Sequence, residues 1–142
     1  MKRILLLIAV WLTASSFTIH LCGDSTMAEK DLSNGNPERG WGMMFQNFLD
    51  EGATVVNYAQ NGRSTKSFIE RGLWDKVVQA IRPGDYVFIE FGHNDAKESD
   101  PERYAAPWGA YQDNLRRFID ETLRCRRGAR RPCREASRRC SG

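Results

Sequence analysis

Three short polar turns hold the side chains with which this sequence could do chemistry. They are residues 23–26 (Gly-Asp-Ser-Thr), 60–64 (Gln-Asn-Gly-Arg-Ser) and 92–95 (Gly-His-Asn-Asp), and each follows a short apolar run. In an open parallel sheet the carboxyl ends of the strands meet at one edge, where ligands bind. Such an edge would gather a serine hydroxyl, a glycine backbone amide and an asparagine carboxamide. A nucleophile with several oxyanion donors is the apparatus of acyl transfer.

Each turn is a weak signal when it is taken alone. Gly23-Asp24-Ser25 is a common type of turn, and Asn61-Gly62 is an ordinary turn signal in which glycine supplies a positive φ. The 92–95 turn alone could be a polar loop. The three together, in this order and each after a strand, predict a site.

Alternating elements must position these turns. Apolar and β-branched runs predict strands, and apolar residues spaced three and four apart predict helices. The helix over 64–81 should break at Gly72. The expected strands are 17–22, 54–59 and 86–91, and the expected helices are 41–49, 64–81 and 108–123. This order is βαβ logic and predicts an α/β fold with right-handed crossovers. The last strand is apolar on both faces, which is typical of an interior strand.

The start of the chain predicts export. Lys2 and Arg3 precede the apolar run Ile4–Leu12, which is too short to span a bilayer. Residues 1–16 are therefore predicted to be a signal peptide, and the protein to be secreted or periplasmic without stable membrane anchoring. A buried first strand is the alternative.

The charge is divided unevenly along the chain. Residues 1–123 carry 13 Lys/Arg and 17 Asp/Glu, a balance of −4, whereas residues 124–142 carry eight Arg and one Glu, a balance of +7. We therefore divide the chain into a domain over 17–123 and an Arg/Cys-rich tail over 124–142. The tail has no large apolar residue with which to cover a core. Its three cysteines match no zinc pattern.

The tail has three interpretations. It could contact nucleic acid, although no aromatic platform accompanies it, and we expect no nucleic-acid partner. It could be a disordered basic segment. It could also be a reading-frame artefact, because the residues that fill it have GC-rich codons, and we prefer this interpretation.

The chain resembles a known family in four stretches. The stretches that carry the resemblance are 19–27 (Ile-His-Leu-Cys-Gly-Asp-Ser-Thr-Met), 39–42 (Arg-Gly-Trp-Gly), 57–65 (Asn-Tyr-Ala-Gln-Asn-Gly-Arg-Ser-Thr) and 88–95 (Phe-Ile-Glu-Phe-Gly-His-Asn-Asp). They are similar to the SGNH (GDSL-like) hydrolases, and within them to the rhamnogalacturonan acetylesterase-like branch. The resemblance covers about residues 17–123.

The resemblance implies a fold and a reaction. The fold would be a three-layer, flavodoxin-like sandwich of which these residues form the N-terminal half, with the second strand on one side of the first and the third on the other. Ser25 would be the nucleophile, and the Ser25 amide, the Gly62 amide and the Asn94 side chain would be oxyanion donors. The reaction would be hydrolysis of O-acetyl esters on a polysaccharide such as pectin, with no metal or other cofactor.

Other residues of the turns are predicted to meet the substrate. Asp24, Arg63 and His93 are the candidates. Arg63 and Lys66 could meet an acidic sugar, or could simply be the solvated start of a helix. Asp95 is interpreted as a loop residue.

One part of the family pattern is missing. Family members carry a late Asp-x-x-His block that supplies the general base, and no histidine follows His93 here. His20 should lie roughly 16 Å along the strand from Ser25, at about 3.3 Å per residue. We therefore expect the chain as written to be impaired. The alternative is a non-catalytic remnant that binds carbohydrate.

Overall fold

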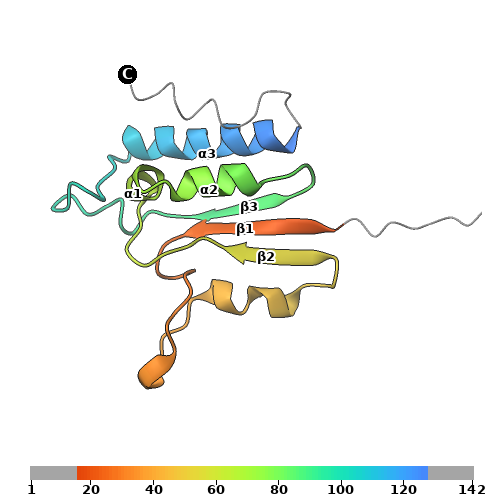
Figure 1. The fold of residues 1–142 in the computed structure, drawn as a ribbon. Helices are drawn as coiled ribbons and strands as arrows, with labels where there is room; N and C mark the ends of the chain where they lie inside the picture. The colour runs from red at the N-terminus through yellow and green to blue at the C-terminus, as the bar shows by residue number, and fades with distance from the viewer. Residues whose placement is uncertain (1–15, 128–142) are drawn as a thin grey trace, which may run out of the picture.

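The computed structural model describes residues 16–127, which form an α/β fold with one parallel sheet (Figure 1). The strands are β1 (Phe17–Gly23), β2 (Ala53–Asn57) and β3 (Tyr86–Glu90). β1 lies between the other two, so the strand order is β2-β1-β3. Both pairings are parallel. These observations confirm the expected fold class and the expected strand order.

Three α-helices cover one face of the sheet: α1 (Thr65–Glu70), α2 (Leu73–Ala80) and α3 (Ala110–Arg126) (Figure 1). Between them and the sheet lies an aromatic core, in which the ring centroids of Trp74 and Phe118 are 4.4 Å apart. Aromatic side chains bury large apolar areas and so contribute strongly to stability. This face therefore fixes the position of the turns that connect strands to helices.

The predicted break in the helical segment 64–81 is confirmed at Gly72. This glycine has a φ of +68°, in the left-handed region that glycine adopts without strain. The first helix begins with a capping box: the Ser67 N–H donates to Ser64 Oγ at 3.1 Å, and the Ser64 N–H donates to Ser67 Oγ at 2.9 Å. This cap fixes where the second polar turn ends and the helix begins.

The α-helix expected over 41–49 is wrong. The structure has two short 3₁₀ segments there, η2 (Trp41–Met43) and η3 (Phe45–Phe48), which lie on the other face of the sheet (Figure 1). The physical reason is a close approach of backbones, since a Cβ on Gly42 would lie 2.4 Å from the Met27 carbonyl oxygen. The segment follows this contact rather than its own apolar spacing. A third 3₁₀ turn, η1, covers Ser33–Gly35.

Helix α3 is longer than expected. It continues past Leu123 to Arg126, and Cys125 is 7% exposed within the same buried cluster as Trp74. The first residues of the predicted tail, 124–126, therefore belong to this helix, and Cys125 among them packs in the core. The remainder of the tail, 128–142, and the predicted signal peptide up to residue 15 lie outside the described residues.

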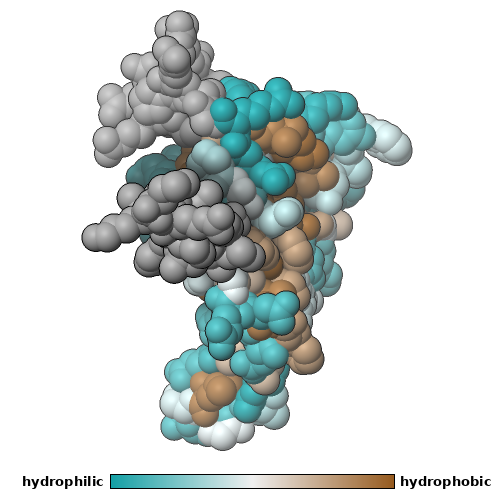
Figure 2. Space-filling view, turned by 90° about the vertical axis from the view of Figure 1, so that its right-hand side faces the viewer, coloured by the Kyte–Doolittle hydropathy of each residue, from teal (hydrophilic) through white to brown (hydrophobic). Residues whose placement is uncertain are grey.

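Strand β3 has a neighbour on one side only in the described sheet. Its apolar sequence predicts an interior strand, yet Tyr86 is 46% exposed and Phe88 is 40% exposed. Apolar surface is also open on the face of the molecule shown in Figure 2. The open side of β3 is distinct from the carboxyl ends of the strands, where the polar turns lie.

Candidate active site

The three polar turns meet at the carboxyl ends of the strands. The Gln60 N–H donates to the Gly23 carbonyl at 3.2 Å, which joins the second turn to the first. The Asn94 carboxamide Nδ2 donates to the Arg63 carbonyl at 2.9 Å and lies 3.5 Å from Asp24 Oδ2. A single side chain of the third turn therefore contacts both of the others, as expected where parallel strands end at the same side of a sheet.

Ser25 lies in the turn that follows β1 and is partly exposed. Neither its hydroxyl nor its backbone N–H takes part in a hydrogen bond within residues 16–127. A nucleophile must have a free hydroxyl, and an oxyanion donor must have a free N–H. Ser25 meets both requirements.

The Asp24 side chain stabilises this turn through hydrogen bonds. Its side chain is buried, and Oδ1 accepts the Thr26 N–H at 3.0 Å while Oδ2 faces Asn94. The Thr26 hydroxyl also contacts Glu90 at the end of β3, and Trp41 Nε1 donates to Glu90 Oε2 at 2.6 Å. Contact between Asp24 and substrate stays a prediction, because the structure shows both carboxylate oxygens directed at the protein.

The orientation of the Asn94 amide is fixed by its neighbours. Asn94 is 2% exposed, and its Oδ1 accepts Lys97 Nζ at 3.0 Å and lies 3.4 Å from Arg103 Nη1. Lysine and arginine can only donate, so the oxygen must face them and the NH₂ must face the other turns. One N–H is engaged by the Arg63 carbonyl, and the other has only the long contact to Asp24.

Gly62 contributes a backbone rather than a side chain. Its φ is +72°, and its N–H is not hydrogen-bonded in the part of the chain that the structure describes. A residue with a Cβ would be strained in this conformation. The turn therefore presents an N–H that is free within residues 16–127. This N–H lies beside Asn94, because the Asn94 side chain donates to the carbonyl of the next residue, Arg63.

The two histidines lie in different environments. His20 is buried on β1, and its Nε2 is 3.2 Å from Asp85 Oδ2. Asp85 precedes β3, at the opposite end of the sheet from Ser25, so His20 does not reach the site. His93 is exposed, although Asn94 beside it is buried, and its ring makes no hydrogen bond within residues 16–127.

Asp95, which was predicted to be a loop residue, is a buried carboxylate. Its Oδ1 accepts the Thr65 N–H at 2.9 Å and the Thr65 hydroxyl at 2.5 Å, whereas its Oδ2 has no partner among residues 16–127. Burial raises the pKa of Asp95, the hydrogen bonds from Thr65 oppose this shift, and the Asp24 charge adds to it. The side chain ties the third turn to the start of α1. Its position one residue after the predicted oxyanion donor was the only available signal.

Two features are absent from the described residues. No group of three or more His, Cys, Asp or Glu side chains within residues 16–127 is arranged to hold a metal ion. No helix in that range has the length and apolar character needed to cross a membrane.

A family model and several known proteins match most of this chain. The model of the GDSL-like lipase/acylhydrolase family matches residues 21–133. A probable rhamnogalacturonan acetylesterase of Bacillus subtilis is 38% identical over 101 residues, which are 71% of this chain and 46% of that protein. A rhamnogalacturonan acetylesterase of the same organism is 38% identical over 102 residues, 72% of this chain and 42% of that protein. The chain thus spans less than half the length of these relatives.

A solved structure shares the fold. The crystal structure of the Bacillus subtilis protein YxiM superposes with a TM-score of 0.69 at 26% sequence identity, covering 78% of this chain and 30% of that one. The same name belongs to an uncharacterized esterase that is 33% identical over 90 residues, 60% of this chain and 24% of that protein.

Proposed function

This chain belongs to the GDSL-like lipase/acylhydrolase (SGNH hydrolase) family, in its rhamnogalacturonan acetylesterase-like branch, and from that premise we propose that its residues carry the nucleophile and the oxyanion donors of a serine ester hydrolase. The substrate we propose is an O-acetyl ester on a plant cell-wall polysaccharide such as rhamnogalacturonan. The relatives named for that activity support this choice of substrate. The protein is proposed to act outside the cytoplasm, on the strength of its charged and apolar N-terminal sequence.

One observation carries the proposal: at the carboxyl ends of the strands, three groups that can donate or attack make no hydrogen bond to any residue that the structure describes. The Ser25 hydroxyl, the Ser25 N–H and the Gly62 N–H have no partner within residues 16–127. Beside them, the Asn94 side chain presents an N–H whose contact with Asp24 Oδ2 is long, at 3.5 Å.

The reaction follows from these positions. Ser25 Oγ attacks the acetyl carbonyl carbon, the carbonyl π bond opens, and its oxygen becomes an oxyanion. The N–H groups of Ser25, Gly62 and the Asn94 side chain stabilise that oxyanion. Collapse breaks the bond to the sugar oxygen, which takes up the proton that Ser25 Oγ has lost and leaves as the sugar hydroxyl. Water then hydrolyses the acetyl-serine to acetate and restores the Ser25 hydroxyl. Loss of one such donor costs about 10²–10³ in rate in a comparable site.

The proton of Ser25 has no evident acceptor among the described residues. His20 is bound to Asp85 at the far end of the sheet, and His93 has no carboxylate to orient its ring. A serine hydroxyl is a poor nucleophile without a base. Removing the base from the subtilisin triad costs on the order of 10⁶ in turnover. We therefore propose that the chain as it stands turns over slowly, while its nucleophile can still be acylated by a reactive ester.

Hydrolysis of 4-nitrophenyl acetate, with mass spectrometry of the protein, tests this proposal. We expect slow release of nitrophenol, an acetyl adduct on Ser25, and loss of both in Ser25→Ala. Ser33→Ala is the matched control, because Ser33 is exposed in η1 and should leave both signals unchanged. Hydrolysis that persists in Ser25→Ala would overturn the assignment of the nucleophile. Rapid turnover that His93→Ala abolishes would instead show that His93 is the base.

A second function is favoured by the same lack of a base. A carbohydrate-binding protein could use the edge of the sheet without turnover. Binding of an acetylated oligosaccharide with no adduct on Ser25 would identify this function.

A further inference from the structure

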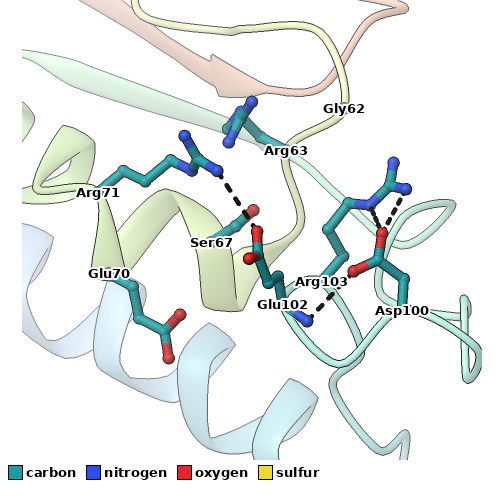
Figure 3. Close-up of a pocket in the computed structure, with 8 residues that line it drawn as sticks. All are labelled: Gly62, Arg63, Ser67, Glu70, Arg71, Asp100, Glu102 and Arg103. Carbon is teal, nitrogen blue, oxygen red and sulfur yellow. Dashed lines mark hydrogen bonds and ion pairs between the residues drawn. The ribbon is translucent and has the colours of Figure 1, made fainter.

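A cavity of about 540 Å³ opens beside the turn that contains Gly62 (Figure 3). Its volume is in the range of small-molecule sites, roughly 300–1,000 Å³. Charged side chains dominate its walls, so it suits a polar ligand rather than a lipid chain. The lining residues are Gly62, Arg63, Ser67, Glu70, Arg71, Asp100, Glu102 and Arg103. Sequence motifs mark only Gly62 and Arg63, because the other lining residues come from α1 and its end and from the loop after β3, where no motif lies.

Most of the charges in this cavity are matched. Asp100 accepts Arg103 Nε at 2.5 Å, and Arg71 Nη2 lies 3.6 Å from Glu102 Oε2. Glu70 points away from the other charges in Figure 3 and lies 4.0 Å from Lys66 Nζ. After these pairs are formed, one lining cation has no carboxylate partner within residues 16–127.

That cation is Arg63. Its guanidinium makes one hydrogen bond within residues 16–127, from Nε to the Asn61 carbonyl at 3.3 Å, and it has no ion pair there. Burial lowers its pKa, and the charges of Arg71 and Arg103 lower it further while Glu102 opposes them. The guanidinium nevertheless stays charged at neutral pH. It is a partly buried cation near two other arginines, and the carboxylates that line the same cavity are already paired with other residues, so Arg63 can gain from an incoming anion.

We propose that Arg63, with Arg71 beside it, binds the carboxylate of a uronic acid residue next to the acetylated sugar. Guanidinium and carboxylate groups match in a planar, bidentate geometry. Arg63 directly follows Gly62, so an anion held there would lie next to the proposed oxyanion donors. The inference rests on the proposed function, because it places an acidic sugar of the polymer beside the sugar whose ester is cleaved.

Glu102 competes with that carboxylate. Its pair with Arg71 is exposed, with side-chain exposures of 82% for Glu102 and 56% for Arg71. Exposed ion pairs of this kind are weak. A ligand carboxylate can therefore take the place of Glu102, and removal of the Glu102 charge should strengthen binding.

Calorimetry and NMR titration of the whole chain with digalacturonate test the proposal, with galactobiose as the neutral ligand. We expect digalacturonate to bind at least about tenfold more tightly than galactobiose, and Arg63→Gln to remove about tenfold or more of that affinity, as for loss of a charged hydrogen bond. Glu102→Gln should bind severalfold more tightly. Arg116→Gln is the matched control, because Arg116 is exposed on α3, pairs with Asp113 and should not change the affinity. Circular dichroism checks that each variant is folded.

Equal binding of the two disaccharides, no detectable binding of digalacturonate, or unchanged affinity in Arg63→Gln would each overturn the proposal. These outcomes are separate from a failure of the proposed function. Binding is measured without ester turnover, so a chain that forms no acetyl-serine can still show the Arg63-dependent preference for the acid. A chain that is acetylated on Ser25 but binds both sugars equally would lose this inference alone.

Discussion

Two buried carboxyl groups, Asp85 and Asp95, occupy opposite ends of the sheet and differ in how fully they are satisfied. Asp85 accepts hydrogen bonds from the Thr18 N–H, the Arg82 N–H and the His20 ring. Within the described residues, Asp95 has partners on Oδ1 but not on Oδ2. Their effects on stability should therefore depend on pH with opposite signs.

The hydrogen bonds to Asp85 stabilise its charged form. Burial raises the pKa of Asp85, but the bonds from Thr18, Arg82 and His20 outweigh burial and hold the pKa below 3.8. Its contribution is thus present above pH 3.8 and is lost as the pH falls through the lowered value. We expect Asp85→Asn to cost about 1–3 kcal/mol at neutral pH. Urea unfolding at neutral pH and below pH 3.8 measures this, and an equal cost at both would contradict it.

Asp95 should behave in the reverse way. Its pKa is raised above 3.8, mainly by burial, so the folded state favours the protonated form. Its contribution is fully present below pH 3.8 and is lost as the pH rises through the raised value. The wild-type free energy of unfolding should therefore fall relative to that of Asp95→Asn as the pH increases. Asp113→Asn, at a side chain that is 72% exposed, is the control and should show no such slope.

At the scale of an element, the N-terminus of α1 links the site to the core. The capping box of Ser64 and Ser67 is fully buried, and the helix that it starts lies directly after the Gly62 turn. Ser64→Ala removes the side-chain acceptor, and we expect it to lower the free energy of unfolding by about 1 kcal/mol. Ser33→Ala should have no measurable effect, since Ser33 is exposed and caps nothing. Equal urea midpoints for the two variants would contradict the role of the cap.

The elements that sequence patterns predicted well are those whose environment repeats along the chain. Alternating strand and helix runs gave the sheet, and Gly72 marked the break in the helix because a left-handed residue is a local requirement. The segment 41–49 shows the limit of this reasoning. Its apolar spacing is helical, but contact between Gly42 and Met27 decides its backbone, and no local pattern reports that contact.

The candidate site was also predicted only in part. Ser25, Gly62 and Asn94 were predicted because each stands in a turn after a strand, and the structure joins those turns through hydrogen bonds. The cavity was not predicted. Arg71 and Arg103 come from separate segments, and their meeting depends on how the loop after β3 folds over α1.

At the scale of the whole molecule, the sheet ends in an apolar edge strand, β3. Within residues 16–127, β3 pairs only with β1, so its outer edge carries unpaired backbone groups. Phe88 on this strand is 40% exposed and stacks on Phe45, with ring centroids 5.6 Å apart. Phe48 on η3 is 80% exposed. An apolar strand with an open edge is a site at which a second chain can add.

We therefore expect the chain to self-associate as its concentration rises, and sedimentation velocity over a concentration series measures this. Phe88→Lys places a charge on the open strand, where natural edge strands carry lysine to prevent pairing, and should shift the chain toward monomer. Ile119→Lys is the matched control: Ile119 is 53% exposed, but it lies on α3, where backbone groups are already hydrogen-bonded. If general apolar contact drove association, the two variants would act alike. If the strand edge drives it, only Phe88→Lys will act, and a wild-type chain that stays monomeric throughout the series would refute both accounts.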